Sequence, residues 1–592
     1  MIQARAAAAF RGATNPPFVA AAAGPVLAAV ISLWVIVPTL APTVASWDTA
    51  EFQTVGPVMG TAHPTGYPAY VILGWVASVV FQPFGNPAFR MNLLQAVLAA
   101  VAVGATVALI GILTGRRLVA LATGLVLLVM PTVSQVSVSL PVPGEIDTTP
   151  VFMRLATHAD PHMFHVALVA ILFGLLAVWE RRVRAAEPAD RGRADRWLVA
   201  AAGVYGVAVA NHSLALLLPP AIGLFVLLSD WRIVLRWRSI VACVAVLAAT
   251  VVVLFAELPI RAAMNAPLVY GHPDTWDGFT YVVLAEQFRG SLVDPLGDLG
   301  DKANAIVNLM SGWLGPLLYL AILGLGTSLV RRPRFVVLSG LTLLATAFFS
   351  VAYANADIER YFLVPVMVAF IWVGLAVADL IYGAELLVER FFGPRDVGTE
   401  APAAPETSDV GPPPASAAQP APAGWAARRL GSAILAAEIV VAIALISPVP
   451  GAVPERQEPD SGFYPGGVSE AGQTDMEAWM DQVLAPADQG GLPDDSVIVS
   501  WWSASTTLWY GQRVLGLRPD IYIVDDRTRL DDNLGSVQDV FNRFLGNRPV
   551  FTIRLDGGVD GMVALSAQFD IQPYTLGDGS TISEVVGRKG NQ

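Results

Sequence analysis

The most constraining feature of this chain is a series of long apolar stretches that carry almost no charge. A helix that crosses a membrane needs about 20 mostly apolar residues, because the hydrocarbon core is ~30 Å thick. Windows of this kind lie at 18–40, 91–113, 118–140, 163–179, 239–257, 304–330, 335–353, 361–383 and 430–449. Because lipid satisfies no backbone hydrogen bonds, we expect these windows to form a multi-pass helical bundle.

The composition supports this interpretation and excludes several other classes of protein. Charged residues make up 14% of the chain and hydrophobic residues 54%, whereas an ordinary soluble domain is about one quarter charged. A soluble enzyme, a disordered regulator and a nucleic-acid binder are therefore excluded. The single cysteine, Cys243, excludes a disulfide scaffold and a cysteine-ligated metal site.

Two further apolar segments do not fit a single span. The segment 197–229 is too long, and it is interrupted at Asn211-His212 and at Pro219-Pro220. It is expected to form two short helices that meet near His212. The segment 68–84 is also apolar, and its hydropathy does not decide whether it crosses the membrane or lies along it.

The placement of arginine resolves the ambiguity at 68–84. Short cytoplasmic loops carry an excess of positive charge, and arginines cluster at 5–11, 116–117, 181–196, 232–238, 331–334 and 390–429. All of these clusters fall on the cytoplasmic side only if 68–84 is an interfacial helix. The pattern then predicts eleven spans in the plasma membrane of the cell, with the N-terminus in the cytoplasm and the C-terminus outside.

The remaining chain separates into a linker and a second domain. Residues 391–429 are rich in Pro and Ala, which predicts a disordered cytoplasmic linker before the last span at 430–449. Residues 452–592 have the character of a water-soluble domain, with strands expected at 495–499, 520–526 and 549–553 separated by helical segments. The fold class is therefore mainly α, a polytopic membrane protein with a small C-terminal extracytoplasmic α/β domain.

The polar residues gather on one side of this predicted bundle, because all six histidines fall on or near the outer face. Asp48 and Glu51 lie in WDTAEF directly after the first span, and HPTGYP follows at 63–68. Spaced three apart, the two carboxylates share one face of a helix. Beside an apolar wall such a carboxylate has a raised pKa and acts as a general base. The alternative is a capping box, with Asp48 at the N-cap and Glu51 at N3.

Two other clusters have competing interpretations. His158, His162 and His165, with Asp160, have a spacing that would suit a metal. No HExxH motif accompanies them, so we predict that the protein uses no metal or other cofactor, with a divalent ion as the alternative. The aromatic pairs 501–502 and 509–510 either stack on a sugar or peptide or belong to the core of the C-terminal domain, and the core is favoured.

WDTAEF and HPTGYP resemble the first-loop signature of a multi-pass family related to protein O-mannosyltransferases, within the GT-C glycosyltransferases. The family was long known only as a domain of unknown function. Weaker matches follow at 90–94, 206–219, 258–273 and 357–361, so the resemblance covers about 40–390. It implies a GT-C-like transmembrane catalytic domain over residues 1–390.

The resemblance also implies a reaction. Its donor is a polyprenyl-phosphate sugar, such as the mannose derivative, and its acceptor is a hydroxyl of a protein or glycan on the outer face. Asp48 matches the aspartate that deprotonates the acceptor, with Glu51 as its catalytic partner and inversion at the anomeric carbon. The expected donor-binding residues are His63, Tyr67, His212, Arg261 and Arg360.

The phosphate of such a donor needs a cation, and the chain has only two lysines, Lys302 and Lys589. Arginine is suited to the role. Besides Arg261 and Arg360, Arg90, Arg154 and Arg289 are further candidates on the outer face. Local ion pairs are the alternative role, with Asp357 for Arg360 and Glu257 for Arg261. For His212, a structural role at the helix break is the alternative.

Two other classes of protein compete with this interpretation. A transporter or flippase of a lipid-linked substrate would place charged residues in the middle of its spans. The windows 91–113, 118–140 and 304–330 carry none, and the acids lie at helix ends. A scaffold that only displays the outer domain would not need eleven spans.

Overall fold

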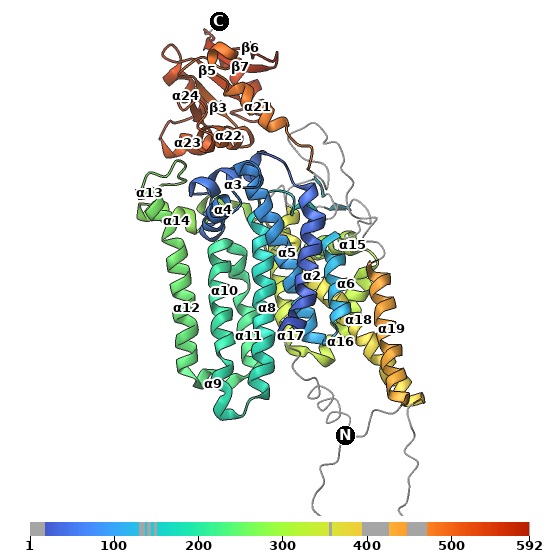
Figure 1. Cartoon of the computed structure of the whole chain (residues 1–592). Helices are drawn as coiled ribbons and strands as arrows, with labels where there is room; N and C mark the ends of the chain where they lie inside the picture. Colours follow the sequence, from blue (N-terminus) through green and yellow to red (C-terminus); the bar gives the residue numbers. More distant parts are fainter. Residues whose placement is uncertain are drawn as a thin grey trace, which may run out of the picture.

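The computed structural model describes residues 18–129, 136–138, 144–146, 151–354, 358–392, 425–446 and 470–590. These residues form a bundle of apolar helices with a smaller α/β domain seated on one end (Figure 1). The bundle contains α2 (Phe18–Ile36), α5 (Pro87–Thr114), α6 (Arg117–Val129), α8 (Pro161–Ala185), α10 (Arg196–Asn211), α11 (Pro219–Ser229), α12 (Trp237–Phe255), α16 (Leu317–Arg331), α17 (Pro333–Ala352), α18 (Leu363–Phe392) and α19 (Trp425–Ile446).

Among the described residues, six helices are long and apolar enough to cross a membrane, or seven if one bent pair is a single span. The six are Ala22–Thr39, Pro87–Thr114, Pro161–Ala185, Trp237–Ala263, Pro333–Ala352 and Ile358–Val388. Shorter apolar helices cover Pro68–Val80, Arg117–Val129, Pro219–Ser229 and Leu435–Leu445. The total of eleven spans stays a prediction.

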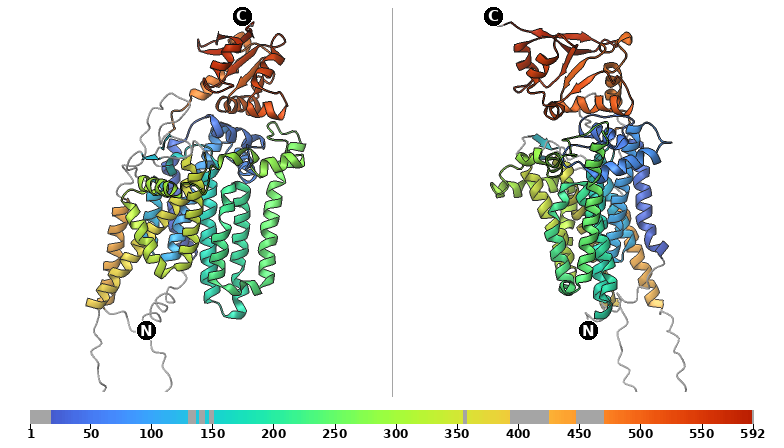
Figure 2. Two further views of the ribbon diagram at one scale, coloured as in Figure 1. Left: turned by 180° about the vertical axis from the view of Figure 1, so that it is seen from behind. Right: turned by 90° about the vertical axis from the view of Figure 1, so that its left-hand side faces the viewer.

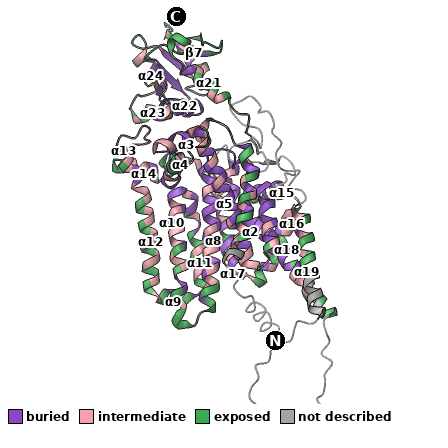
Figure 3. Ribbon diagram, in the orientation of Figure 1, coloured by how far each residue is buried: buried purple, intermediate pink, exposed green. Residues whose placement is uncertain are grey.

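The burial of these helices fits a lipid environment. In the 18-residue apolar window of Ile358–Val388, 94% of the residues are buried within the protein, whereas none is buried in the window of Trp237–Ala263, although its mean hydropathy is 2.8. Figure 3 shows the contrast between the buried interior of the bundle and the exposed surface of α12. Because water would oppose exposure of so apolar a helix, α12 is suited to face lipid.

The break predicted near His212 is confirmed. Helix α10 ends at Asn211, a short 3-10 turn η3 covers Ser213–Leu217, and α11 begins at Pro219. Pro219 and Pro220 lack the N–H that a continuous helix would need there. Asn211 also donates through Nδ2 to the carbonyl of Pro161, 3.1 Å away, which ties the break to the start of α8.

The window predicted at 304–330 does not form one uninterrupted helix, and whether it crosses the membrane as a broken span stays a prediction. Helix α15 (Leu299–Leu314) and α16 meet at an angle of 113°. Gly315 has φ 50° and Pro316 has no N–H, so an uninterrupted helix is excluded at this point. Both views in Figure 2 show α15 lying across the end of the bundle rather than along it.

Two shorter helices lie at the end of the bundle that carries the α/β domain (Figure 1). They are α3 (Trp47–Val58) and α4 (Pro68–Val80). The 13 residues of α4 rise by about 20 Å, which is less than the thickness of the hydrocarbon core. The interfacial placement of 68–84 stays a prediction.

Arginines from several loops meet at the opposite end of the bundle. Arg181 donates to the carbonyl of Ile112 at 3.0 Å, and Arg334 donates to that of Leu228 at 2.7 Å. Arg236 binds Asp195 and Asp230, at 2.7 Å each. The described arginines of the clusters at 181–196, 232–238 and 331–334 are therefore gathered at one end, remote from the α/β domain, while their cytoplasmic orientation stays a prediction.

Some predictions concern residues outside the described ranges. They are the arginines at 5–11, the turn residue Asp357 and most of the linker 391–429, since 393–424 are not described. The domain boundaries at 390, 429 and 452 are likewise predictions that no observation here tests.

The α/β character of the C-terminal domain is confirmed. Its sheet contains β3 (Val497–Ser500), β4 (Tyr522–Val524), β5 (Val550–Ile553), β6 (Phe569–Thr575) and β7 (Thr581–Arg588), in the order β4-β3-β5-β7-β6. Strands β4, β3 and β5 are parallel, and β7 pairs antiparallel with β5 and β6. The helices of the domain are α21 (Asp475–Val483), before the first strand, and α22 (Trp502–Trp509), α23 (Asp526–Asp531), α24 (Val537–Phe544) and α25 (Met562–Gln568), between the strands.

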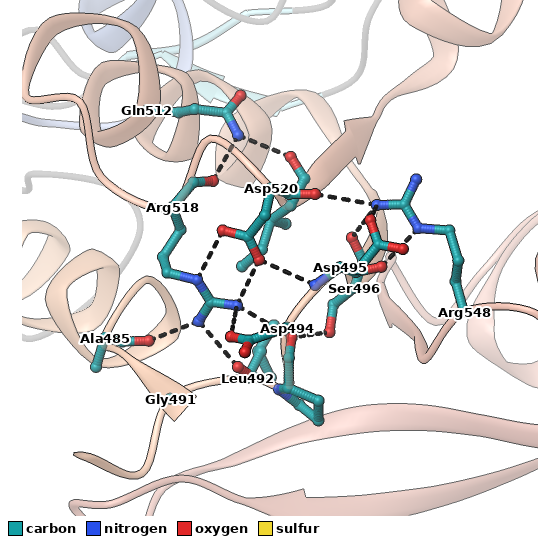
Figure 4. Close-up of polar contacts among 12 residues, drawn as sticks. Ala485, Gly491, Leu492, Asp494, Asp495, Ser496, Gln512, Arg518, Asp520 and Arg548 are labelled. Atoms are coloured by element: carbon teal, nitrogen blue, oxygen red, sulfur yellow. Dashed lines mark hydrogen bonds and ion pairs between the residues drawn. The ribbon is translucent and has the colours of Figure 1, made fainter. Parts of the chain in front are cut away.

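Two arginines close the edge of the sheet at which the parallel strands begin (Figure 4). Arg548, before β5, donates to the carbonyls of Asp495 and Asp520, which precede β3 and β4. Arg518 donates to Asp520 at 2.8 and 2.9 Å and to the carbonyl of Leu492 at 2.9 Å. This network satisfies the backbone at the amino ends of the strands and leaves their carboxyl ends for other contacts.

Candidate active site

A cavity of about 630 Å³ lies between the end of the bundle and the C-terminal domain. Its wall on the bundle side is lined by residues that include Asp48, Phe52, His63, Tyr67, His162, His212, Phe288, Tyr353, Arg360 and Tyr361. Its roof is formed by Trp501, Trp502, Asp525, Asp526 and Arg527 of the C-terminal domain. Segments more than 450 residues apart in sequence therefore share one site.

Asp48 is the carboxylate of the bundle that is open to this cavity. It lies in the first turn of α3, and its side chain is 26% exposed, compared with 5% for Asp160 and 0% for Glu51. Its Oδ2 accepts from Nη1 of Arg360 at 3.1 Å, and its Oδ1 accepts from Nε1 of Trp502 at 3.0 Å. The N-cap of α3 is Ser46, so the predicted capping role of Asp48 is wrong.

The raised pKa predicted for Asp48 is also wrong. Burial by itself raises the pKa of this carboxyl, but His63, Arg360 and the N–H of Trp502 together outweigh burial and lower the pKa below its usual value. The sequence showed the apolar wall but not these partners. Asp48 is therefore ionised at neutral pH and able to accept a proton, although it is a weaker base than expected.

Glu51 holds His63 and does not reach the cavity. Its Oε1 accepts from the backbone N–H of His63 at 2.7 Å, and its Oε2 accepts from Nδ1 of His63 at 2.5 Å. The side chain has no exposure and does not line the cavity. In this structure Glu51 therefore orients His63, and its role as the catalytic partner of Asp48 stays a prediction.

The charges of both carboxylates act on His63. Burial lowers the pKa of its imidazole, but Glu51 and Asp48 outweigh burial and raise the pKa above its usual value. Nε2 of His63 lies 3.2 Å from the hydroxyl of Tyr67. His63 and Tyr67 both line the cavity, and their donor-binding role stays a prediction.

Arg360 provides a fixed cation in the wall of the cavity. It lies in a 3-10 turn, η6 (Ile358–Phe362), and its side chain is 11% exposed. Its Nη1 is 3.1 Å from Oδ2 of Asp48 and 3.4 Å from Oδ2 of Asp160, the N-cap residue of α8. These partners come from two distant segments, and the predicted local partner Asp357 lies outside the described residues.

Arg261 is not brought into the cavity. It lies in α13 (Glu257–Ala263), and it donates to the carbonyls of Met59 at 2.9 Å and Val58 at 3.0 Å. These carbonyls belong to the C-terminal end of α3, where a cation satisfies unpaired backbone acceptors. In this structure the side chain caps the end of α3, and the donor-binding role expected for Arg261 stays a prediction.

The other candidate arginines also differ in whether they line the cavity. Arg90 donates to the carbonyls of Ser78 and Gly85, and Arg154 lies 3.8 Å from Glu359. Neither lines the cavity. Arg289 does line the cavity, but its side chain is 59% exposed and pairs with Glu286 at 3.2 Å.

His212 has the predicted structural role at the helix break, and its donor-binding role stays a prediction. Its Nδ1 accepts from the backbone N–H of Leu214 at 3.1 Å, which is the structural role at the break. In the neutral ring this bond leaves the proton on Nε2, and Nε2 is buried without a hydrogen-bond partner among the described residues. His212 lines the cavity 4.5 Å from the ring of His162, so it retains one N–H donor for a ligand.

The three histidines at 158–165 have separate environments. His158 binds Glu470 at 2.8 Å, His162 binds Asp160 at 2.8 Å, and neither ring nitrogen of His165 has a partner among the described residues. The described part of the chain contains no group of three or more His, Cys, Asp or Glu side chains that could hold a metal ion.

Sequence reasoning missed the roof of the site. Trp501 and Trp502, for which the core was favoured, line the cavity, whereas Trp509 and Tyr510 are buried as expected. A usable signal was present, because the strand predicted at 520–526 ends in the acids Asp525 and Asp526. Nothing local in the sequence, however, showed that this strand ends above Asp48.

The C-terminal domain is docked on the bundle by several specific contacts. Oγ1 of Thr507 donates to the carbonyl of Ala45 at 2.7 Å, and the hydroxyl of Tyr510 accepts from the N–H of Ala88 at 3.2 Å. The guanidinium of Arg527 lies 3.6 Å from the ring centre of Tyr270. The roof is therefore held in place from more than one side.

Comparison with known proteins adds evidence from sequence. Residues 48–234 match the family model of the Protein O-mannosyl-transferase TMEM260 N-terminal domain. Protein O-mannosyl-transferase TMEM260 from Mus musculus is 39% identical over 64 residues, which are 11% of this chain and 9% of that protein. The resemblance to the O-mannosyltransferase-related family is confirmed for the matched residues, and the match spans about a tenth of the length of the curated relative.

A crystal structure of ArnT from Cupriavidus metallidurans, bound to undecaprenyl phosphate, aligns over 95% of this chain and 97% of its own. The two chains share 14% identity, with a TM-score of 0.49, and the lipid is a ligand of that protein.

Proposed function

We propose that this chain is a membrane glycosyltransferase of GT-C architecture. It transfers a sugar, which we take to be mannose, from a polyprenyl-phosphate donor to a hydroxyl of a protein or glycan on the outer face of the plasma membrane. The observation that carries the proposal is Asp48, an ionised carboxylate that opens onto the cavity within the family-matched residues.

The proposed reaction is a single displacement. The acceptor hydroxyl gives its proton to Asp48 while its oxygen forms a bond to the anomeric carbon of the donor. The bond from that carbon to the phosphate oxygen breaks, and the electron pair leaves with the polyprenyl phosphate. Attack on the face opposite the phosphate inverts the anomeric centre.

Two groups in the wall suit the departing phosphate. Arg360 offers a charged N–H fork of the kind that matches phosphate oxygens, and Nε2 of His212 offers an N–H without a partner in the described residues. The pairs with Asp48 and Asp160 hold Arg360 in the cavity. Tyr67 and His63 are placed to contact the sugar or phosphate from the same wall.

The test is sugar transfer by membranes that contain the wild-type protein or Asp48→Asn, with radiolabelled polyprenyl-phosphate sugars as donors. Loss of a general base lowers the rate by ~10²–10⁴-fold, and donor binding should persist. Asp488→Asn, an exposed carboxylate of the C-terminal domain, is the matched control. Wild-type turnover in Asp48→Asn would remove Asp48 from the mechanism and favour the alternative, a transporter or flippase of a lipid-linked substrate.

A further inference from the structure

The C-terminal sheet has a topology that creates a ligand crevice. Its parallel strands are ordered β4-β3-β5, so the chain passes from β3 to β4 on one side and then crosses to β5 on the other. In open α/β sheets, ligands bind outside the carboxyl ends of the strands where the direction of winding reverses. In this domain that point lies between β3 and β5.

The carboxyl edge of the sheet opens onto the cavity that contains Asp48. Trp501 and Trp502 follow β3, Asp525 and Asp526 follow β4, and all four line the cavity. Arg554, which follows β5, donates to Asp526 at 2.9 and 3.2 Å and braces this edge. The opposite edge is closed by its own hydrogen bonds (Figure 4), so the carboxyl edge is the one left for a ligand, on the side of the proposed base.

The roof has hydrogen-bonding capacity that the protein does not use. Nε1 of Trp501 and Nη1 of Arg527 are buried and have no hydrogen-bond partner among the described residues. Buried donors without partners are costly, and oxygen atoms of a ligand would satisfy them. The side chain of Asp526 is 40% exposed, and its carboxylate has more lone pairs than its contacts with Arg554 occupy.

These groups indicate the chemical class of the ligand. Vicinal hydroxyls both donate and accept hydrogen bonds, so they match N–H donors that lie beside a carboxylate, while the C–H face of a sugar ring packs on an indole. The five roof residues include no aliphatic side chain that would form a pocket for an apolar peptide side chain. A lipid-linked donor enters from the bundle side, so the roof is left for the substrate that arrives from water.

We therefore propose that the carboxyl edge of the C-terminal sheet is the acceptor-binding half of the active site, and that it takes a carbohydrate acceptor. This rests on the proposed glycosyltransferase function and specifies its acceptor. Trp501, Asp526 and Arg527 bind the acceptor ring and direct one hydroxyl toward Asp48. A sugar ring of the donor has the same chemistry, so the experiment must separate the two sources.

The experiment uses the purified full-length protein and has two parts. The first titrates soluble trisaccharides of mannose, glucose and galactose and measures binding without turnover. The second measures transfer from polyprenyl-phosphate mannose to the best-bound trisaccharide or to a peptide rich in Ser and Thr. Trp501→Phe keeps the ring and removes the donor N–H, and Trp479→Phe, on α21 and not lining the cavity, is the matched control.

We expect Trp501→Phe and Asp526→Asn each to weaken trisaccharide binding and to raise the acceptor KM two- to tenfold, the range for loss of one hydrogen bond. The donor KM should stay unchanged. Absence of saturable binding by every trisaccharide, a rise in the donor KM alone, or transfer to the peptide but not to the sugar would each overturn the proposal. Binding that depends on Trp501 without any transfer would support the carbohydrate site and count against the proposed function instead.

Discussion

The bond between Trp502 and Asp48 allows a direct test of how the outer domain affects the proposed base. Nε1 of Trp502 donates to Oδ1 of Asp48 at 3.0 Å. Trp502→Phe removes this N–H and keeps an aromatic ring next to His63 and Trp509, whose rings lie 6.1 and 5.7 Å from that of Trp502. The main change is therefore the loss of one hydrogen bond to a carboxylate.

The direction of the effect follows from the groups that act on Asp48. Burial raises its pKa, while His63, Arg360 and the Trp502 N–H lower it. Removal of the Trp502 N–H therefore raises the pKa of Asp48. Only ionised Asp48 accepts a proton, so the acidic limb of the profile of kcat/KM against pH should move to higher pH, with a smaller change on the plateau.

The magnitude follows from the charge of the acceptor. A hydrogen bond to a charged group contributes about 1.5–3 kcal/mol, and 1.36 kcal/mol corresponds to a factor of about ten in a protonation equilibrium. At a pH below the pKa of Asp48, the ionised fraction should fall roughly tenfold to hundredfold. The side chain of Asp48 is 26% exposed, which favours the lower end of this range.

The assay is the pH profile of sugar transfer for purified wild-type protein, Trp502→Phe and Trp479→Phe. Trp479 is a partly buried residue of the same domain that does not line the cavity, so its variant should reproduce the wild-type profile. A Trp502→Phe profile that is unmoved, or moved to lower pH, would refute a role of this bond in setting the protonation of Asp48. A uniform loss of activity at all pH values would indicate a structural role only.

Three further changes test the site and the bundle. Glu51→Gln should lower kcat more than it raises the donor KM, because the substitution weakens the hydrogen bond to His63 and changes no residue that lines the cavity. A change in the donor KM alone would contradict this role. Arg360→Lys should raise the donor KM about tenfold in steady-state assays, since lysine keeps the charge but loses the fork, and an unchanged KM would place the phosphate elsewhere. Gly324→Ala should lower the free energy of unfolding in detergent by about 1–3 kcal/mol, because the added Cβ would lie 1.9 Å from a backbone carbonyl oxygen of α18. Gly326→Ala is the control, because a Cβ at that position meets open space. Equal stability of the two variants would contradict this packing.

Features that depend on neighbouring residues were readable from the sequence alone. The apolar windows predicted the helices of the bundle, because burial in lipid or protein requires a continuous apolar surface. Asn211-His212 and the following prolines predicted the break between α10 and α11, since proline lacks the N–H of a helix. The alternation of strands and helices predicted the C-terminal α/β domain.

The bend between α15 and α16 is a feature that average hydropathy does not predict. The window from 304 to 330 is apolar on average, and this average conceals the break at Gly315 and Pro316. The left-handed φ of Gly315 and the missing N–H of Pro316 decide the local geometry. The direction that α15 then takes depends on the helices against which it packs.

By itself, the sequence determined that this chain forms an apolar helical bundle with an outer α/β domain, and it placed Asp48, His63, Tyr67, His212 and Arg360 among the candidates for one site. Only the tertiary structure decided the role of each. It directed Arg261 to the end of α3, buried Glu51 beneath His63 and brought Trp502 to Asp48 across 454 residues. The physical reason is that hydropathy and helix breaks act over a few neighbouring residues, whereas the partners and the pKa of a buried side chain depend on which distant segments pack around it.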